Sequence, residues 1–435
     1  MRGCQRRFRS GLPPVQDQGF TFGVELLPPR RASLTAPFID AVALLRPYQP
    51  AYHILPMKAP YFAAAGRSGM EDAVDHVRRV GGRVILTVTA TMSADEGSGA
   101  AATREGVRRI LHDFVGRRGG DALLLLRGDV GRRNDERASA AVQERHGGFR
   151  DSVELLQFAA GEARALTGAP VLLLSSGYPQ GHPMERIWGP DRHASLSFLG
   201  KLSAAVGAAG PDVAVDQPPR DWDAACAQAR KLLHRVELAL LLREVPSTLP
   251  REAAQGAVRT LVREKILRHG VRGVITQTLT DAAEFIAYVD DVHRELRRAD
   301  AGGLAQAVTL LPSIVAPLTA EEYTRLLLFT KVIPSAAVQQ ALREYRDGLR
   351  AAVAAGPRLG GGDEGRAQEL MDTTAALAQT FRATLEEETV ELCRAVLGAG
   401  HRCLNFSVFR NSNLPALLRL IDRLRGEAPA APRLQ

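Results

Sequence analysis

The stretch VLLLSSGYPQGHP at Val171–Pro183 combines a change of local structure with chemically useful side chains. Its apolar first part, Val171–Leu174, is typical of a strand that is buried on both faces, as in a parallel sheet. Gly177 and the prolines end that strand, and Tyr178 and His182 place two flat polar rings just beyond it. Few structural turns need this combination, whereas a cofactor with a flat ring and a phosphate tail would use it.

The alternation of short apolar runs with helical segments continues on both sides of this stretch. The runs that predict strands are Phe20–Leu27, Ala51–Leu55, Val84–Thr89, Ala122–Leu126, Val171–Ser175, Gly273–Gln277, Ala307–Leu311 and Cys403–Phe409. Amphipathic segments separate most of them, for example Glu71–Val80, Arg104–Val115 and Ser152–Leu166. Eight strand–helix units predict an α/β fold of the (β/α)8 TIM barrel type. A doubly wound open sheet is the alternative, and the absence of a GxGxxG after the first strand disfavours it.

The spacing between the fifth and sixth predicted strands is too long for one strand–helix unit. Residues 186–257 are therefore interpreted as a long helical insertion, with the amphipathic stretch Trp222–Leu242 as its main helix. We expect this insertion to pack on the barrel or on a partner subunit. The other predicted units are a basic N-terminal extension (1–17), the barrel (18–426) and a disordered Ala/Pro-rich tail (427–435).

Composition narrows the classes of partner. The chain has 435 residues, 45% of them hydrophobic, and a net charge of +8 that comes largely from scattered arginines. Because no basic stripe is interleaved with aromatics, nucleic acid is not the expected partner, and an acidic small molecule is. No apolar run approaches the ~20 residues that span a bilayer, so no membrane association is expected.

The cysteines and the N-terminal residues indicate whether the chain binds a metal and in which cellular compartment it works. The four cysteines form no CxxC pair, and no His/Asp/Glu cluster has metal-ligand spacing, so no metal site is predicted. This cysteine usage suits a reducing compartment, and we expect a cytoplasmic protein, with a homo-oligomer as one candidate assembly. The Arg-rich segment Arg2–Arg9 leaves a cleaved transit peptide, and hence a mitochondrial location, as the alternative.

Glu25 is the clearest candidate for acid–base chemistry. It lies at the end of the first predicted strand among Val and Leu, just before Pro28 and Pro29. Partial desolvation there favours the protonated carboxyl, which suits a general acid. A salt-bridged glutamate at a strand end is an equally good interpretation of this residue alone.

Three further candidates have structural alternatives. Asp129 follows the strand Leu123–Leu126 and is held at the predicted barrel mouth, although it would also serve as a helix cap. Gln277 ends the sixth strand and suits the edge of a heterocycle, or else it bonds to neighbouring loop backbone. Lys265, on the preceding helix, would reach a phosphate or remain a solvated lysine.

Four motifs, taken in order, resemble the methylenetetrahydrofolate reductase family. That family carries a Glu-Phe-Phe-Pro-Pro type of first strand, an Arg-Gly-Asp after the fourth, a Tyr-Pro-x-x-His-Pro after the fifth and an Ile-Thr-Gln at the end of the sixth. The counterparts here are Glu25-Leu-Leu-Pro-Pro, Arg127-Gly-Asp, Tyr178-Pro-Gln-Gly-His-Pro and Ile275-Thr-Gln. The resemblance covers about residues 18–425, apart from the insertion, and implies a flavoprotein barrel.

The resemblance implies a role for each matching residue. The FAD site would be lined by Arg127, Gly128, Asp129, Tyr178, His182 and Lys265. Asp129 and Gln277 would also contact the folate substrate, and Glu25, with Asp129 nearby, would supply the acid that opens the imidazolidine ring. The implied reaction passes hydride from NAD(P)H through FAD to 5,10-methylenetetrahydrofolate and gives 5-methyltetrahydrofolate, a reaction of one-carbon metabolism and methionine biosynthesis.

The chain also departs from the family at ligand-contacting positions. Thr-Tyr-Gly after strand two is replaced by Pro56-Met57-Lys58, the histidine of strand three by Ile85, and the aromatic run after Ile-Thr-Gln by Thr278-Leu279-Thr280. Aromatic rings hold flat ligands, so these losses support an alternative. In that alternative the chain is a catalytically silent, diverged barrel that acts as a structural or regulatory subunit.

Overall fold

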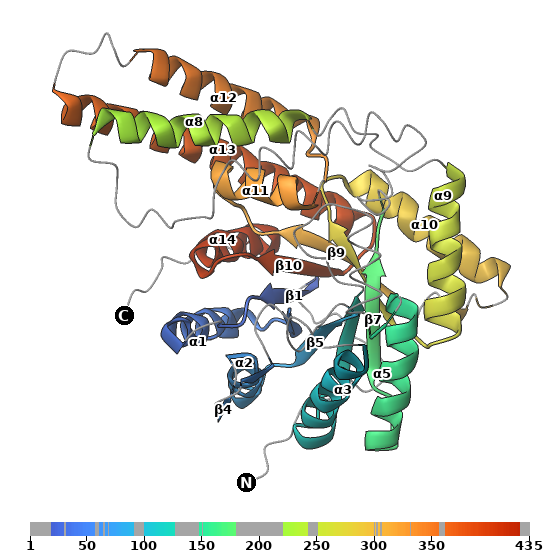
Figure 1. Cartoon of the computed structure of the whole chain (residues 1–435). Coiled ribbons are helices and arrows are strands. Elements are labelled where there is room, and N and C mark those ends of the chain that lie inside the picture. Colours follow the sequence, from blue (N-terminus) through green and yellow to red (C-terminus); the bar gives the residue numbers. More distant parts are fainter. Residues whose placement is uncertain are drawn as a thin grey trace.

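The structure is a computed structural model of the whole chain (Figure 1). It describes residues 19–29, 32–56, 61–63, 66–67, 69–90, 100–126, 148–149, 151–179, 221–241, 251–299, 301, 303–304, 307–330, 332–355 and 362–426. The predicted N-terminal extension and C-terminal tail lie outside these residues.

Eight parallel strands close into a barrel, which confirms the predicted fold class. In chain order the barrel strands are β1 (Thr21–Leu26), β2 (Tyr52–Leu55), β5 (Val84–Thr89), β6 (Ala122–Leu126), β7 (Leu172–Gly177), β8 (Gly273–Thr278), β9 (Thr309–Val315) and β10 (Cys403–Val408). Each strand pairs with the next along the chain, and β10 pairs with β1 to close the ring. A two-stranded hairpin, β3 (Phe62–Ala63) with β4 (Gly66–Arg67), stands outside the barrel.

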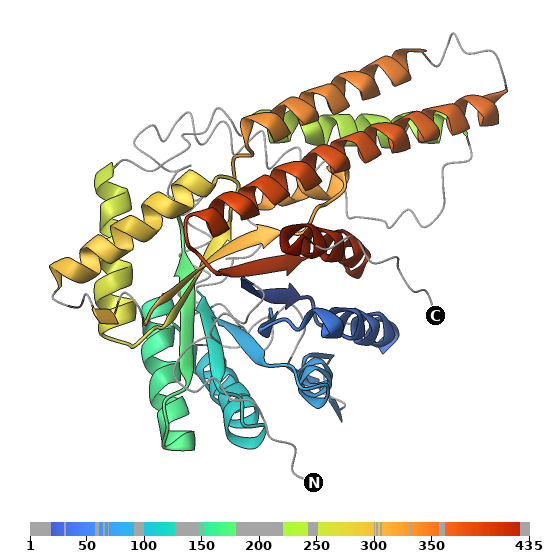
Figure 2. The same ribbon diagram turned by 180° about the vertical axis from the view of Figure 1, so that it is seen from behind.

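Helices from the segments that connect successive strands surround the barrel (Figures 1 and 2). The surrounding α-helices are α1 (Thr35–Leu45), α2 (Gly69–Arg79), α3 (Ala100–Leu111), α5 (Ser152–Thr167), α9 (Arg251–Thr260), α10 (Ala282–Arg298) and α14 (Leu414–Arg425). Two of them continue as π-helical turns, η3 (His112–Arg117) after α3 and η5 (Leu261–Leu267) after α9. Short 3-10 turns are η1 (Ala32–Leu34), η2 (Arg46–Tyr48) and η8 (Asn411–Asn413). The main core lies between the outer faces of the strands and these helices.

Four more helices form a bundle that projects from one side of the barrel (Figures 1 and 2). They are α8 (Trp222–Leu241), α11 (Ala320–Thr330), α12 (Ala336–Ala355) and α13 (Asp363–Gly398). The bundle has its own core, in which Phe381 of α13 packs against Tyr323 at a ring-centroid distance of 5.8 Å and against Tyr345 at 6.2 Å. The helical insertion between the fifth and sixth strands thus contributes α8, which packs on α11, α12 and α13 of the same chain. No helix among the described residues is long and apolar enough to cross a membrane.

The seventh barrel strand differs in position from its prediction. Ala307–Leu311 was expected, and β9 instead extends to Val315 and runs through Pro312. A proline has no N–H for a sheet hydrogen bond, so it is tolerated where the pairing is interrupted. The register between β8 and β9 shifts at this point, because Ile275 is paired with Leu311 and Thr278 with Ser313. This β-bulge lets the strand continue past the proline.

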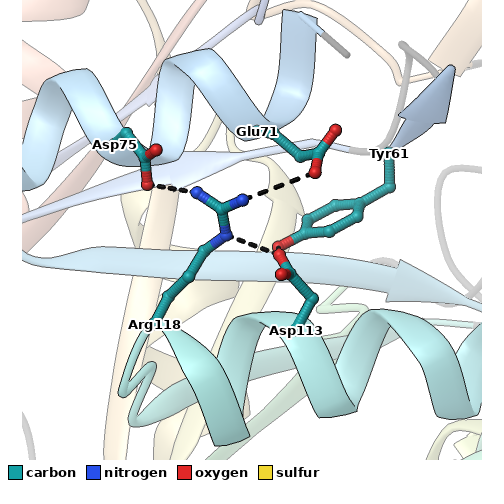
Figure 3. A network of polar contacts seen from close by, with 5 residues as sticks. All are labelled: Tyr61, Glu71, Asp75, Asp113 and Arg118. Carbon is teal, nitrogen blue, oxygen red and sulfur yellow. Dashed lines mark hydrogen bonds and ion pairs between the residues drawn. The ribbon is translucent and has the colours of Figure 1, made fainter. Parts of the chain in front are cut away.

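A buried ionic cluster joins α2 to η3 and to the chain before the hairpin (Figure 3). Arg118 contacts Asp75 and Asp113, and its Nη2 lies 3.4 Å from Oε1 of Glu71. The Tyr61 hydroxyl donates a 2.7 Å hydrogen bond to Oδ2 of Asp113. Burial, reinforced by this bond, raises the pKa of Tyr61, so its proton stays in place. Because Glu71 and Asp113 are both buried, Arg118 is the cation that makes their burial tolerable.

The burial of His53 leads us to expect that the folded protein becomes less stable at acidic pH. Its ring is buried on the outer side of β2, and burial lowers its pKa from 6.5 to about 4. Between these pH values the unfolded chain binds a proton that the folded protein excludes, so lowering the pH favours unfolding. We expect the free energy of unfolding of the wild type to fall by about 3 kcal/mol more than that of His53→Met over this window. Urea titrations at pH 7 and pH 4 measure this difference, and equal losses in the two proteins would refute it.

Candidate functional site

The strands present alternate side chains to the barrel interior and to the helices. On β1, Phe22, Val24 and Leu26 belong to the core under the helices, so Glu25 points into the barrel. Glu25 is partly exposed and is the penultimate residue of its strand. The predicted acid therefore lies inside the carboxyl end of the barrel, which is where the active sites of such barrels occur.

The lower part of the interior is a packed apolar plug. One buried cluster gathers side chains from six consecutive strands: Tyr52, Ile54, Ile85, Ala122, Leu124, Leu172, Leu174, Ile275 and Leu311. At its base the Tyr52 ring occupies the space beside Gly23, where an added Cβ would lie 1.9 Å from the Tyr52 Cε2 atom. This plug closes the barrel from below, so a ligand would enter only at the carboxyl end.

Above the plug, the interior becomes polar. Tilted strands in an eight-stranded barrel are staggered by about one residue from each strand to the next. When the pairing registers are followed around the ring with this stagger, Glu25, Thr87, Ser176 and Ser313 lie at the same height on alternate strands. Branched apolar residues usually fill such a layer. We call these four residues the polar layer.

The Glu25 carboxylate is hydrogen-bonded inside the barrel. The Ser407 hydroxyl, on the neighbouring strand β10, donates to Oε2 of Glu25 at 3.4 Å. The hydroxyl oxygens of Ser407 and Ser313 lie 3.3 Å apart. Both serines are buried, so this chain of hydroxyls holds one oxygen of the carboxyl, and the Glu25 residue as a whole is partly exposed.

Tyr178 lies at the mouth, directly after the end of β7, and is half-buried. The preceding Gly177 has no room for a side chain, because an added Cβ would lie 2.5 Å from the Tyr288 hydroxyl and 2.8 Å from a Val274 methyl. The glycine thus lets α10 pack closely against the end of the strand. The other predicted cofactor contacts, Arg127, Gly128, Asp129 and His182, lie outside the described residues.

Lys265 is on the helix side of the barrel wall. Its ammonium donates a 3.0 Å hydrogen bond to the Ser175 hydroxyl. Ser175 faces outward, because its neighbour Leu174 is part of the inner plug. Burial lowers the pKa of Lys265 to about 8, and Asp151 partly offsets this effect. The lysine was predicted to contact a cofactor phosphate, and such a contact would require the ammonium to leave Ser175.

Gln277 uses one of its donors within the protein. Its Nε2 donates a 3.0 Å hydrogen bond to the backbone carbonyl of Thr330, at the end of α11. Gln277 lies in the β-bulge, and a bulge redirects the side chains it contains. This geometry corresponds to the backbone-bonded alternative of the sequence analysis and leaves the side-chain carbonyl as an acceptor.

Sequence motifs did not identify several polar residues of the interior. Ser313 lies in the stretch Leu311–Ile314, which resembles the end of the family's seventh strand, but neither it nor Ser407, Thr87 or Asn405 was singled out, because each is a common residue type. The signal that was available is the two-residue period of the predicted strand Cys403–Phe409, where Leu404 and Phe406 alternate with Asn405 and Ser407. The described residues contain no group of three His, Cys, Asp or Glu side chains arranged to hold a metal ion.

No family model matches the chain, and no curated protein sequence matches it. Among solved structures it is similar to an uncharacterized protein from Clostridium thermocellum that binds two copies of 5-methyl-5,6,7,8-tetrahydrofolic acid. The identity is 9% and the TM-score 0.44, over 94% of this chain and 96% of that chain. It is also similar to a riboflavin lyase solved with modified FMN and riboflavin (10% identity, TM-score 0.31, 94% and 96% covered). A third neighbour is the catalytic domain of a beta-amylase from Paenibacillus polymyxa (9% identity, TM-score 0.23, 92% and 94% covered). These ligands and activities are properties of those proteins.

Proposed function

We propose that this chain is a flavin-dependent oxidoreductase that passes hydride from NAD(P)H through FAD to 5,10-methylenetetrahydrofolate, giving 5-methyltetrahydrofolate. The observation that carries the proposal is the Glu25 carboxyl, which points into the carboxyl end of a closed parallel barrel and accepts a hydrogen bond from Ser407. The order of the four sequence motifs supports the same reaction. In this proposal the FAD, when bound, supplies the hydride carrier.

The described part of the mouth fits a flat ligand with hydrogen-bonding edges. Tyr178 provides a ring at the end of β7, and the polar layer provides hydroxyls and a carboxyl beneath it. Arg127, Gly128, Asp129 and His182 would complete the cofactor site in the roles that the family resemblance implies. Gln277 would offer its side-chain carbonyl to the folate or the nicotinamide.

Glu25 would act as the general acid. Its proton would pass to the ring nitrogen that departs as the imidazolidine ring of the substrate opens, which leaves the methylene carbon electron-poor and ready to accept hydride. Ser407 would orient the carboxyl so that one oxygen faces the mouth. The apolar plug below would exclude water from the lower side of the site.

The visible absorption spectrum of the purified protein tests this proposal first. We expect a flavin band, either as purified or after addition of FAD, with bleaching by NAD(P)H under anaerobic conditions. Addition of 5,10-methylenetetrahydrofolate should then restore the band. A folded protein that is colourless and binds no added FAD would contradict the proposal and favour the alternative, a catalytically silent barrel with a structural or regulatory role.

A further inference from the structure

Asn405 is a buried polar residue inside the barrel. Its relative exposure is 0%, and within the described part of the chain neither its side-chain oxygen nor its side-chain nitrogen has a hydrogen-bond partner. It points inward, because its neighbours Leu404 and Phe406 pack under the helices. An unpaired buried amide costs free energy, so such groups normally have a partner that is either protein, water or a ligand.

The described side chains at the height of Asn405 offer it no hydrogen-bond partner. The strand registers place it at the same height as Ile54, Leu124 and Ile275, all of which are apolar members of the plug. The polar layer lies immediately above. There the Thr87 hydroxyl is also buried and has no hydrogen-bond partner among the residues that the structure describes. Glu25 and Ser176 of this layer are partly exposed, so it opens toward the mouth.

We propose that Asn405, Thr87 and Ser176 form a binding subsite for the edge of a carboxamide or lactam that descends into the barrel. We call these three residues the barrel floor. The inference deepens the proposed function and rests on it for the kind of heterocycle that enters the mouth.

The chemistry of the floor selects this ligand class. A side-chain amide offers a donor and an acceptor side by side, which matches the –CO–NH– edge of another amide. Among the described residues that face inward, no lysine or arginine is present to neutralise an anion. Thr87 and Ser176 place hydroxyls at positions where branched apolar residues usually lie in such barrels. The apolar neighbours exclude water, which strengthens a hydrogen bond formed there.

Three parts of the proposed reactants carry such an edge, and binding of isolated probes distinguishes them. Nicotinamide represents the carboxamide of NAD(P)H, pterin the lactam of folate, and lumichrome the cyclic imide of flavin. Ligand-observed NMR titrations with the full-length protein give the dissociation constant of each. We expect at least one probe to bind. The probe with the lowest dissociation constant shows which of the three reactants places its amide edge in the subsite. Nicotinate, the carboxylate analogue of nicotinamide, should bind at least about tenfold more weakly if nicotinamide binds.

Asn405→Leu tests the role of the amide. We expect this substitution to raise the dissociation constant of the probe about tenfold. The melting temperature should stay the same or rise, because the substitution removes two unpaired polar atoms from an apolar layer. Leu311→Met, in the layer below, is the matched control and should leave probe binding unchanged. The inference is overturned if no probe binds to the wild type, or if Asn405→Leu binds probes as the wild type does. A clear drop in its melting temperature would also overturn it, because the amide would then already be paired in the free protein.

The experiments distinguish a failure of the proposed subsite from a failure of the proposed flavin reaction. A protein that lacks a flavin band and refuses FAD, yet binds nicotinamide or pterin in an Asn405-dependent way, would retain the subsite and lose the flavin reaction. A protein that binds FAD and turns over, but binds the probes equally well with Asn405→Leu, would retain the reaction and lose the subsite.

Discussion

Glu25→Gln should slow the reoxidation of the reduced flavin by 5,10-methylenetetrahydrofolate by about 10²- to 10⁴-fold, the usual contribution of a general acid. Glutamine keeps the shape of the side chain and accepts the hydrogen bond from Ser407, but it has no carboxylic proton to give. Reduction of the flavin by NAD(P)H needs no such proton and should remain close to the wild-type rate. Anaerobic stopped-flow absorbance measures the two half-reactions separately.

Glu264→Gln is the matched control for this experiment. Glu264 lies on the outer helix layer and pairs with the exposed Arg268, so its loss should leave both half-reactions unchanged. If Glu25→Gln also leaves folate-dependent reoxidation unchanged in a protein that binds flavin, the catalytic role assigned to Glu25 is wrong.

Arg118→Met should destabilise the protein by about 3–5 kcal/mol, the usual consequence of leaving buried charges without their partner. Arg118 is the shared partner of Glu71, Asp75 and Asp113, the first and last of which are buried. Methionine fills similar space without charge, so the loss reflects the carboxylates that remain. Urea-induced unfolding followed by circular dichroism gives the free energy of unfolding.

Arg423→Met provides the comparison with an exposed ion pair. Arg423 makes two hydrogen bonds to the carboxylate of Glu387, whose side chain is 64% exposed. Water solvates both charges once the pair is broken, so the expected loss is much smaller than for Arg118→Met. Equal losses for Arg118→Met and Arg423→Met would show that the cluster around Arg118 is not an essential part of the fold.

The barrel could be predicted from the sequence because its signals are local. Each buried strand is a short apolar run with a polar or glycine-rich end, and all eight predicted runs form the barrel strands of the structure. The predicted run Ala307–Leu311 stops before Pro312, whereas β9 continues through the proline to Val315, and the bulge in β8 accommodates it. The bundle was only partly foreseen. Periodicity shows that α8 has an apolar face, but it does not show that α12 and α13 cover it.

The candidate site was predictable where a residue has a distinctive neighbourhood. Glu25 stands out as an acid among apolar residues before two prolines, and the structure places it inside the barrel mouth. The directions of Lys265 and Gln277 could not be predicted, because each depends on a neighbouring element: Ser175 on the outer face of β7, and the bulge that turns Gln277 toward α11. Asn405 and Thr87 are informative only once the registers of several strands are known.

The packing of α8 has a consequence for synthesis of the chain on the ribosome. Cys226, Ala229 and Val236 of α8 are buried against helices that follow much later in the sequence. At ordinary translation rates α8 emerges on the order of ten seconds before α13 is complete. During that interval its apolar face has no native cover, so we expect chains that terminate before α12 to aggregate.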